Sequence, residues 1–191
     1  TRDSKENIRE NYRIFSNAVG IRDESIVTSS QFHNANIKVC SYKDRGAGVI
    51  FPMPYSDMDG LVTNEKDVTL CIFSADCIPI LFADPVNKCI GACHCGWKGT
   101  IKDLAKLTVE KLSTEYGADP KNMKVVIAPG IKKCCYEVSE ELYRDFENKY
   151  HFNDGSFEIK DNKYYLDLPL INKNILLSAG ILKENIYISD L

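Results

Sequence analysis

The spacing of apolar residues predicts a chain of alternating helices and short strands. Over residues 4–19 the apolar positions recur at helical intervals, which predicts an amphipathic helix that covers the core. These positions are Ile8, Tyr12, Phe15 and Val19. Asp3 or Ser4 can cap the start of this helix, and Gly20 can end it.

Strand-like and helical segments then follow one another along the chain. Strands are expected at 25–28, 37–42, 69–73, 123–128 and 184–191, with a hairpin over 157–167. Helices are expected at 101–116, capped by Thr100, at 140–150, capped by Ser139, and at 168–178, closed by Gly180. Because the sequence shows no repeat, low-complexity stretch or linker, residues 1–191 are expected to form one mixed α/β domain.

Residues 71–95 hold two apolar, strand-like segments, and the second shows a clear alternation. One face of this segment would carry Cys89, Gly91, Cys93 and Cys95, and the other Ile90, Ala92 and His94. His94 is therefore expected to point away from the neighbouring cysteines. This argues against a metal site built from those cysteines alone.

The composition is that of a soluble, folded chain that works inside the cell. The sequence is 44% apolar and 27% charged, and its net charge of −3 is spread along the chain, so neither a nucleic-acid partner nor a membrane anchor is expected. No apolar run reaches the length of a membrane span, and the first residues do not resemble a signal peptide, which favours the cytoplasm. The eight cysteines are therefore interpreted as reduced thiols, mostly buried. The chain starts without Met and stops inside a strand-like segment, so we expect both ends to be trimmed.

Cys77 and His94 are candidate metal ligands because each lies on or beside one of the two apolar segments. Thiolate sulfur and imidazole nitrogen suit zinc, and a catalytic zinc needs three protein ligands with one open position. Only two other histidines exist: His33 at a strand edge, where sites are often built, and His151 in a polar segment typical of a solvated loop. On these residues alone, a hydrogen-bonded structural role for His33 and His94 is an equal alternative.

A glycine-rich turn, Gly96-Trp97-Lys98-Gly99, leads into the helix expected after Thr100. Free backbone N–H groups, the helix dipole and the cation of Lys98 would together favour a bound anion. The alternative is an ordinary capped turn between strand and helix, which the spacing alone favours.

Five blocks of the sequence, taken in order, carry a family resemblance. They are Gln31-Phe32-His33, Met58-Asp59-Gly60-Leu61-Val62-Thr63, Ser74-Ala75-Asp76-Cys77-Ile78-Pro79, His94-Cys95-Gly96-Trp97-Lys98-Gly99-Thr100, and Ala128-Pro129-Gly130 with Cys134-Cys135-Tyr136-Glu137-Val138. Together they closely resemble the signature of the laccase-domain family, also called YfiH-like or peptidoglycan editing factor-like. A vertebrate relative in that family acts on purine nucleosides.

The resemblance implies a compact mixed α/β sandwich and a zinc site held by His33, Cys77 and His94. It implies phosphorolysis of purine nucleosides such as adenosine or inosine, giving the free base and ribose 1-phosphate, together with adenosine deamination. The partners implied are therefore a small nucleoside and phosphate. The chain departs from the family at Cys95, where Ala or Ser is usual, and at Lys98, where Arg is frequent.

Roles for further residues follow from these two reactions. Asp76 and Asp59 are candidates for moving protons, with a positioning role as the alternative for Asp76. Phosphate would lie against the turn formed by Gly96, Lys98, Gly99 and Thr100, with Arg45 as a second cation. For Arg45, an ordinary position in a surface loop is the favoured alternative.

Three other readings of the site are open. A multicopper oxidase would need more imidazoles than three, although a single copper ion suits the same ligands. A cysteine hydrolase would use Cys77 as nucleophile, activated by His94 or His33. A structural zinc module would need a fourth ligand, for which Cys134 or Cys135 is the candidate.

Overall fold

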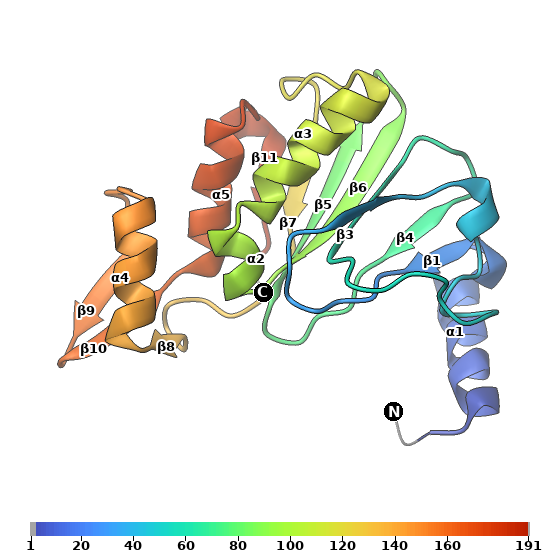
Figure 1. Cartoon of the computed structure of the whole chain (residues 1–191), viewed down its shortest axis with the longest axis horizontal. Coiled ribbons are helices and arrows are strands. Elements are labelled where there is room, and N and C mark those ends of the chain that lie inside the picture. The colour runs from blue at the N-terminus through green and yellow to red at the C-terminus, as the bar shows by residue number, and fades with distance from the viewer. Residues whose placement is uncertain (1–2, 191) are drawn as a thin grey trace.

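The computed structural model describes residues 3–190 and has a six-stranded mixed sheet at its centre (Figure 1). The strands of this sheet are β2 (Ile37–Val39), β3 (Gly60–Thr63), β5 (Ile78–Asp84), β6 (Cys89–Cys95), β7 (Lys124–Ile127) and β11 (Ile186–Ile188). Their order is β11-β7-β5-β6-β3-β2, and only the two outer pairs are parallel. Thr1, Arg2 and Leu191 lie outside the described residues, so the structure does not address the expected trimming or the last residue of the expected final strand.

Two smaller sheets and five α-helices complete the fold. The small sheets pair β1 (Ile26–Thr28) with β4 (Thr69–Cys71), and β8 (Glu137–Val138) and β9 (Phe157–Lys160) with β10 (Lys163–Leu166). The helices are α1 (Lys5–Val19), α2 (Trp97–Ile101), α3 (Leu104–Tyr116), α4 (Glu140–Lys149) and α5 (Leu168–Ser178). The short 3-10 helices are η1 (Asp23–Ser25), η2 (Tyr42–Asp44) and η3 (Lys183–Asn185). The expected mixed α/β fold is confirmed.

The main core lies between one face of the large sheet and the helices α3 and α5 (Figure 1). Alternate residues of β5 are buried, and they meet the apolar sides of these helices because side chains alternate across a strand. The buried members include Ile78, Ile80, Phe82, Val125, Ile127, Leu104, Val109, Leu112, Ile171 and Ile175. A second core joins Val27, Cys40, Leu61 and Val68 beside the β1–β4 pair. On the large sheet, Leu81 and Val126 lie across from one another and are exposed, so the helices cover one face of this sheet only.

The alternation expected along residues 89–95 is confirmed. The Sγ atoms of Cys93 and Cys95 lie 3.5 Å apart in the core that α3 and α5 cover. His94, one position out of phase, projects from the opposite face of β6. The functional side chain is thus held by the same strand that supplies two core thiols.

Two expectations about helices need correction. Helix α1 has the expected bounds, with Ser4 as its N-cap and Gly20 in the left-handed region at its C-cap, but the fold covers only part of its predicted apolar face. Only Ser16 is buried, while Phe15 is 56% exposed and Val19 52%. The helix stands at the end of the molecule away from α4 (Figure 1). Ile8 and Tyr12 are half-buried, and burial and then the nearby Cys71 of β4 raise the pKa of Tyr12. The spacing of apolar residues predicts which side of a helix is apolar, but it does not predict whether the fold buries that side.

The second correction concerns the segment after the glycine turn. A single helix capped by Thr100 was expected, but α2 and α3 are separate helices. The break falls at Asp103, which has a φ of 59° and forms the N-cap of α3, while Thr100 lies inside α2. Asp103 holds this bend by accepting hydrogen bonds from Tyr150 and Lys149, two partners that come from a distant part of the sequence.

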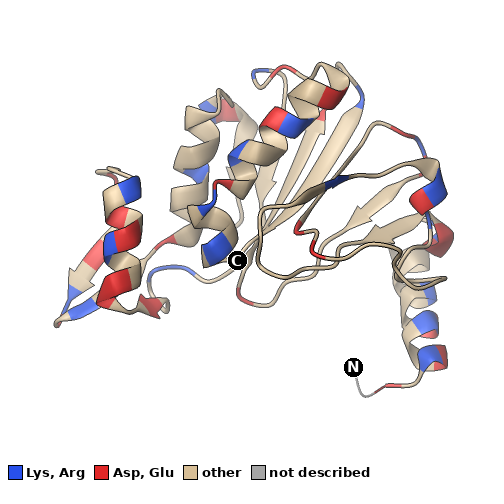
Figure 2. Cartoon of the chain, viewed as in Figure 1, with Lys and Arg blue, Asp and Glu red and all other residues tan. Residues whose placement is uncertain are grey.

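The surface carries mixed charge. Basic and acidic residues occur together on each of α1, α3 and α4 (Figure 2). In the described part of the chain, no helix combines the length and the apolar character that a membrane crossing requires.

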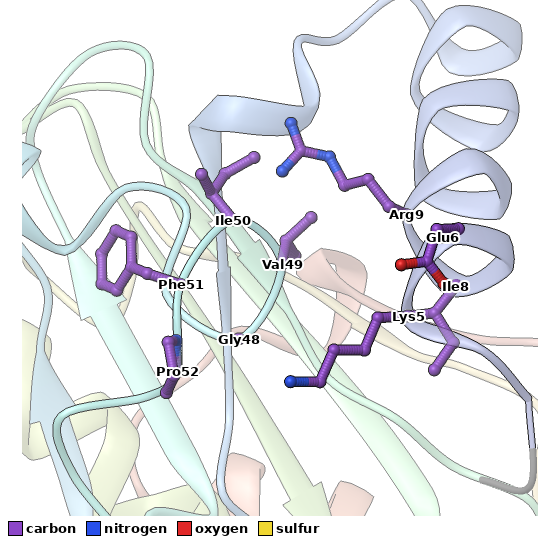
Figure 3. Close-up of a pocket in the computed structure, with 9 residues that line it drawn as sticks. All are labelled: Lys5, Glu6, Ile8, Arg9, Gly48, Val49, Ile50, Phe51 and Pro52. Atoms are coloured by element: carbon purple, nitrogen blue, oxygen red, sulfur yellow. The ribbon is translucent and has the colours of Figure 1, made fainter.

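A hollow of about 530 Å³ separates α1 from the loop at 48–52, and Lys5 and Arg9 extend from the helix toward this loop (Figure 3). Its lining shares no residue with the predicted site.

Candidate metal centre

The buried carboxylate of Asp59 organises the segment that carries His33. Asp59 lies directly before β3 and is fully buried. Its two oxygens accept hydrogen bonds from the backbone N–H groups of Phe32, His33 and Asn34, at 2.9–3.1 Å. These bonds hold His33 in the left-handed region, with a φ of 59°, a conformation that costs energy for a residue other than glycine. Asp59 therefore fixes the turn that presents the His33 ring.

The same carboxylate orients His94. His94 Nδ1 lies 2.9 Å from Asp59 Oδ1, and the backbone N–H of His94 donates to the carbonyl oxygen of Asp59 at 2.8 Å. With Nδ1 engaged, Nε2 is the ring nitrogen left to bind a ligand. Burial disfavours the charged ring, but hydrogen bonds to Asp59 and Cys77 outweigh it and raise the pKa of His94 to about 9. The pKa of Asp59 is lowered because the hydrogen bonds from His94 and the backbone outweigh the effect of burial.

Cys77 approaches the two histidines from the loop that precedes β5. Ser74 donates a hydrogen bond to the carbonyl oxygen of Cys77 and closes this loop. The sulfur lies so near Gly96 that a Cβ built on that glycine would be 2.8 Å from Cys77 Sγ and 3.2 Å from His33 Cδ2. The glycine of the turn is thus required for close approach, since it leaves room for sulfur and imidazole together.

His33, Cys77 and His94 together form a three-ligand cluster. Their candidate ligand atoms all lie within 4.8 Å of one another, and the rings of His33 and His94 meet edge to face at a centroid distance of 4.9 Å. His94 is buried, Cys77 half-buried and His33 exposed, so the cluster opens to solvent on the His33 side. Two imidazoles, one thiolate and an open side are a donor set that zinc accepts.

The other residues predicted for catalysis and phosphate binding fall in different surroundings. Asp76 is exposed beside Cys77, and its carbonyl oxygen accepts a hydrogen bond from the N–H of Ile131 at 2.7 Å. Lys98 is exposed at the start of α2, with its ammonium group 5.4 Å from the centre of the Trp97 ring. Both charged residues are therefore exposed to solvent.

Thr100 and Gly99 do not fit the phosphate role predicted for them. The Thr100 hydroxyl is fully buried and accepts a hydrogen bond from Asn172 at 2.9 Å. Gly99 is also buried, and a Cβ on it would lie 3.1 Å from the carbonyl oxygen of His94. Thr100 thus joins α2 to α5, and Gly99 lets α2 pack against the end of β6. Arg45 stacks on the ring of Tyr42 at 4.3 Å, in the segment that follows η2.

The residues considered as alternative ligands do not join this cluster. Cys134 and Cys135 are exposed and contact each other, with their sulfurs 3.3 Å apart. His151 is exposed in the segment that follows α4, as its polar surroundings indicated. Among residues 3–190, the group close enough to hold a metal ion consists of His33, Cys77 and His94.

Sequence reasoning assigned no role to Gly130 or Tyr136, and both lie near Cys77. A Cβ on Gly130 would lie 3.0 Å from the carbonyl oxygens of Asp76 and Cys77, so this glycine lets its loop pack on the loop that carries the thiol. Burial, and then the nearby Cys77, raise the pKa of Tyr136. A Pro-Gly pair directly after a predicted strand is a signal for such a turn, but it does not indicate which loop the turn contacts.

Known proteins are similar to this chain over nearly its whole length. A family model described as multi-copper polyphenol oxidoreductase laccase matches residues 1–191. Purine nucleoside phosphorylase LACC1 of Mus musculus is 35% identical over 185 residues, which cover 97% of this chain and 40% of the mouse protein. Purine nucleoside phosphorylase YlmD of Bacillus subtilis (strain 168) is 32% identical over 170 residues, which cover 88% of this chain and 61% of that protein.

Among solved structures, the crystal structure of Bacillus licheniformis hypothetical protein YfiH matches with a TM-score of 0.92 and 30% identity. The match covers 100% of this chain and 72% of that one. The chain thus has the fold of that protein, while it spans less than two thirds of the length of the two curated relatives.

Proposed function

The chain belongs to the multi-copper polyphenol oxidoreductase laccase family, and from this premise we propose that it is a zinc-dependent purine nucleoside phosphorylase. Its reaction would convert adenosine or inosine and phosphate to the free base and ribose 1-phosphate. The relatives that share the fold are named purine nucleoside phosphorylases. The observation that carries the proposal is the cluster of His33, Cys77 and His94, with its ligand atoms within 4.8 Å.

The three residues of the cluster have ligand atoms that suit zinc, and neighbouring residues hold them in place. His94 is fixed by Asp59 through Nδ1, which is the usual arrangement behind a metal-binding imidazole. Gly96 has no Cβ where Cys77 Sγ and His33 converge. When bound between these three residues, zinc would act as a Lewis acid with an open coordination position.

Phosphorolysis places specific demands on the surrounding residues. A phosphate oxygen bonds to the anomeric carbon of ribose, the bond from that carbon to the purine nitrogen breaks, and the base leaves with a proton. Lys98 is the cation best placed for the phosphate, because it is exposed two residues from Gly96. Asp76 is the exposed carboxylate beside Cys77 that would hold or deliver a proton.

Asp59 is proposed here as a positioning residue. Its carboxylate is fully buried and already accepts hydrogen bonds from His94 and from three backbone N–H groups. A group so engaged has no path to a substrate proton. Adenosine deamination, the second activity proposed for this site, would therefore draw on Asp76 for proton transfer.

A cysteine nucleophile is the second candidate for this site. The hydrogen bond between Cys77 and His94 resembles the thiol–imidazole pair that such enzymes use, and it contributes to the raised pKa of His94. The bond from His94 Nδ1 to Asp59 fits either role, because a carboxylate also orients the histidine of a catalytic pair. Against the nucleophile, a ring nitrogen of His33 also lies within 4.8 Å of the Cys77 sulfur. Two histidines on one thiol favour metal binding over a single catalytic pair.

Nucleoside turnover separates these proposals. Adenosine is incubated with the protein, with and without phosphate, and the products are separated by chromatography. We expect adenine, hypoxanthine and ribose 1-phosphate only when phosphate is present, inosine as the product that accumulates without phosphate, loss of all these products after chelation, and their recovery with zinc. Turnover that survives chelation but is abolished by thiol alkylation would contradict the zinc enzyme and support the cysteine nucleophile.

A further inference from the structure

Two neighbouring thiols, Cys134 and Cys135, lie outside the candidate metal centre. Their sulfurs are 3.3 Å apart, and both side chains are exposed. The other cysteines of the chain are buried or half-buried: Cys40, Cys71, Cys77, Cys89, Cys93 and Cys95. A reagent in solution therefore reaches this pair more readily than the remaining thiols.

The loop holds both sulfurs on the same side. The carbonyl oxygen of Lys132 accepts hydrogen bonds from the N–H groups of Cys135 and Tyr136, each at 3.0 Å, which closes a tight turn around the pair. Cys134 also lines a surface hollow of about 190 Å³ together with Lys133, Glu158, Lys160, Asp161 and Tyr165. Lys133 donates a hydrogen bond to the carbonyl oxygen of Gly155 at 3.1 Å and pairs with Glu158 at 3.4 Å. The geometry leaves room for a small molecule beside Cys134.

We propose that Cys134 and Cys135 form a redox-active dithiol site that exchanges with small-molecule disulfides such as oxidised glutathione. In the first step the Cys134 thiolate attacks one sulfur of the disulfide, and one glutathione thiolate leaves. In the second step the Cys135 thiolate attacks Cys134 Sγ, and the second glutathione leaves. The protein loses two hydrogens, and the disulfide is reduced to two thiols.

Two observations assign the first attack to Cys134. The hydrogen bond with Cys134 raises the pKa of Cys135, so Cys135 keeps its proton while its neighbour reacts. Cys134 is also the member of the pair that lines the hollow in which the incoming disulfide has room. Cys135 then resolves the mixed disulfide from 3.3 Å away.

The resulting disulfide is expected to be easily reduced. Neighbouring Cα atoms lie about 3.8 Å apart across a trans peptide, which is below the roughly 4.4–6.8 Å usual for disulfide-bonded residues. Strained and exposed disulfides of this kind are the labile ones. The site is therefore suited to reversible oxidation and not to a permanent cross-link.

The dithiol loop contacts the loop that carries Cys77. The N–H of Ile131 donates to the carbonyl oxygen of Asp76 at 2.7 Å, and Gly130 packs on the carbonyl oxygen of Cys77. A disulfide between Cys134 and Cys135 would strain their turn, which directly follows Gly130 and Ile131 in the sequence. Zinc affinity is therefore expected to fall on oxidation, a consequence that rests on the proposed function of the Cys77 site.

The test treats the full chain, loaded with zinc, with oxidised glutathione and maps its cysteines by peptide mass spectrometry. Wild type should lose two hydrogens in the peptide with Cys134 and Cys135, retain no glutathione, and recover with dithiothreitol. Cys135→Ser should retain one glutathione at Cys134, while Cys134→Ser should react at least tenfold more slowly. An unreacted pair, a retained adduct in wild type, or oxidation mapped to other cysteines would overturn the dithiol site.

A separate titration with zinc tests the link to Cys77. Oxidised wild type should bind zinc more weakly than reduced wild type, and the double variant Cys134→Ser, Cys135→Ser should show no such difference. Equal affinities of oxidised and reduced wild type would overturn the link while the mass measurement still decides the dithiol site. If neither form binds zinc, the proposed function fails, and the mass measurement is unaffected.

Discussion

At the scale of single residues, Asp59 connects the two histidines of the candidate metal centre. It bonds to the ring of His94 and to three consecutive N–H groups around His33. From the sequence, Asp59 was a candidate for moving protons, because an aspartate in a recognised block gives no sign of its burial. The structure shows four hydrogen bonds and no exposure, which are the properties of a carboxylate that orients its neighbours.

Replacing this carboxylate should weaken zinc binding and the fold together. In Asp59→Asn the amide has fewer acceptor positions for the same donors, so we expect a loss of about 2 kcal/mol in the free energy of unfolding. Zinc affinity should fall about 10–100-fold. Urea denaturation and competitive zinc titration measure the two effects.

Asp57→Asn is the matched control. Asp57 lies two residues away and accepts hydrogen bonds from the side chains of Asn34 and Asn36, without contacting either histidine in this way. It should retain the zinc affinity of wild type. Equal losses in the two variants would show that Asp59 has no special role in positioning the ligands.

The backbone conformation at Gly96 suits alanine, but the neighbouring side chains leave no room for its Cβ. Its φ of −68° and ψ of 177° are open to any residue, yet the new Cβ would lie 2.8 Å from Cys77 Sγ. Overpacking of this kind costs about 1–3 kcal/mol, so Gly96→Ala should lower zinc affinity by roughly 5- to 150-fold. Zinc titration would show this, with Lys98→Ala as the control that keeps zinc and loses phosphate affinity. Unchanged zinc binding in Gly96→Ala would contradict the close approach of sulfur to this turn.

The stability of metal-stripped protein should depend on pH through His94. Its pKa rises from 6.5 to about 9 on folding, so protonation stabilises the folded state. This contribution is fully present below pH 6.5 and is lost as pH rises through about 9. Urea denaturation of wild type and His94→Gln should therefore show a stability difference that shrinks across this range. A difference that stays constant or grows with pH would contradict the hydrogen bonds assigned to His94.

At the scale of elements, local patterns predicted most strands and helices, and tertiary contacts decided the rest. The alternation over residues 89–95 placed His94 opposite Cys93 and Cys95, and Ser4, Ser139 and Gly20 marked helix ends correctly. The break at Asp103 could not be predicted, because it depends on Tyr150 and Lys149 from a distant helix end. The strand expected at 37–42 ends at Val39, since the chain turns there into η2.

The exposed side of helix α1 should contribute little to the stability of the fold. Phe15 is 56% exposed, whereas Leu112 of α3 is fully buried in the main core. Phe15→Ala should therefore change the free energy of unfolding by no more than about 0.5 kcal/mol, against about 2–5 kcal/mol for Leu112→Ala. Chemical denaturation measures both. A loss above about 2 kcal/mol for Phe15→Ala would show that α1 is covered in solution.

At the scale of the whole molecule, the fold brings three distant segments to one point. His33 comes from a turn held by Asp59, Cys77 from the loop before β5, and His94 from the end of β6. Spacing along the chain could nominate Cys77 and His94, because they flank one hairpin. It could not choose between His33 and a structural histidine; the family resemblance made that choice, and the structure places all three side chains together.

The metal content of the purified protein tests the central claim most directly. Wild type, His33→Ala, Cys77→Ala and His94→Ala are purified without added metal, reconstituted with zinc and analysed by mass spectrometry, with His151→Ala as the exposed-histidine control. We expect about one zinc per chain in wild type and His151→Ala, and its loss in the other three variants. Wild type without zinc, or zinc that persists in Cys77→Ala and both ligand-histidine variants, would contradict the proposed centre.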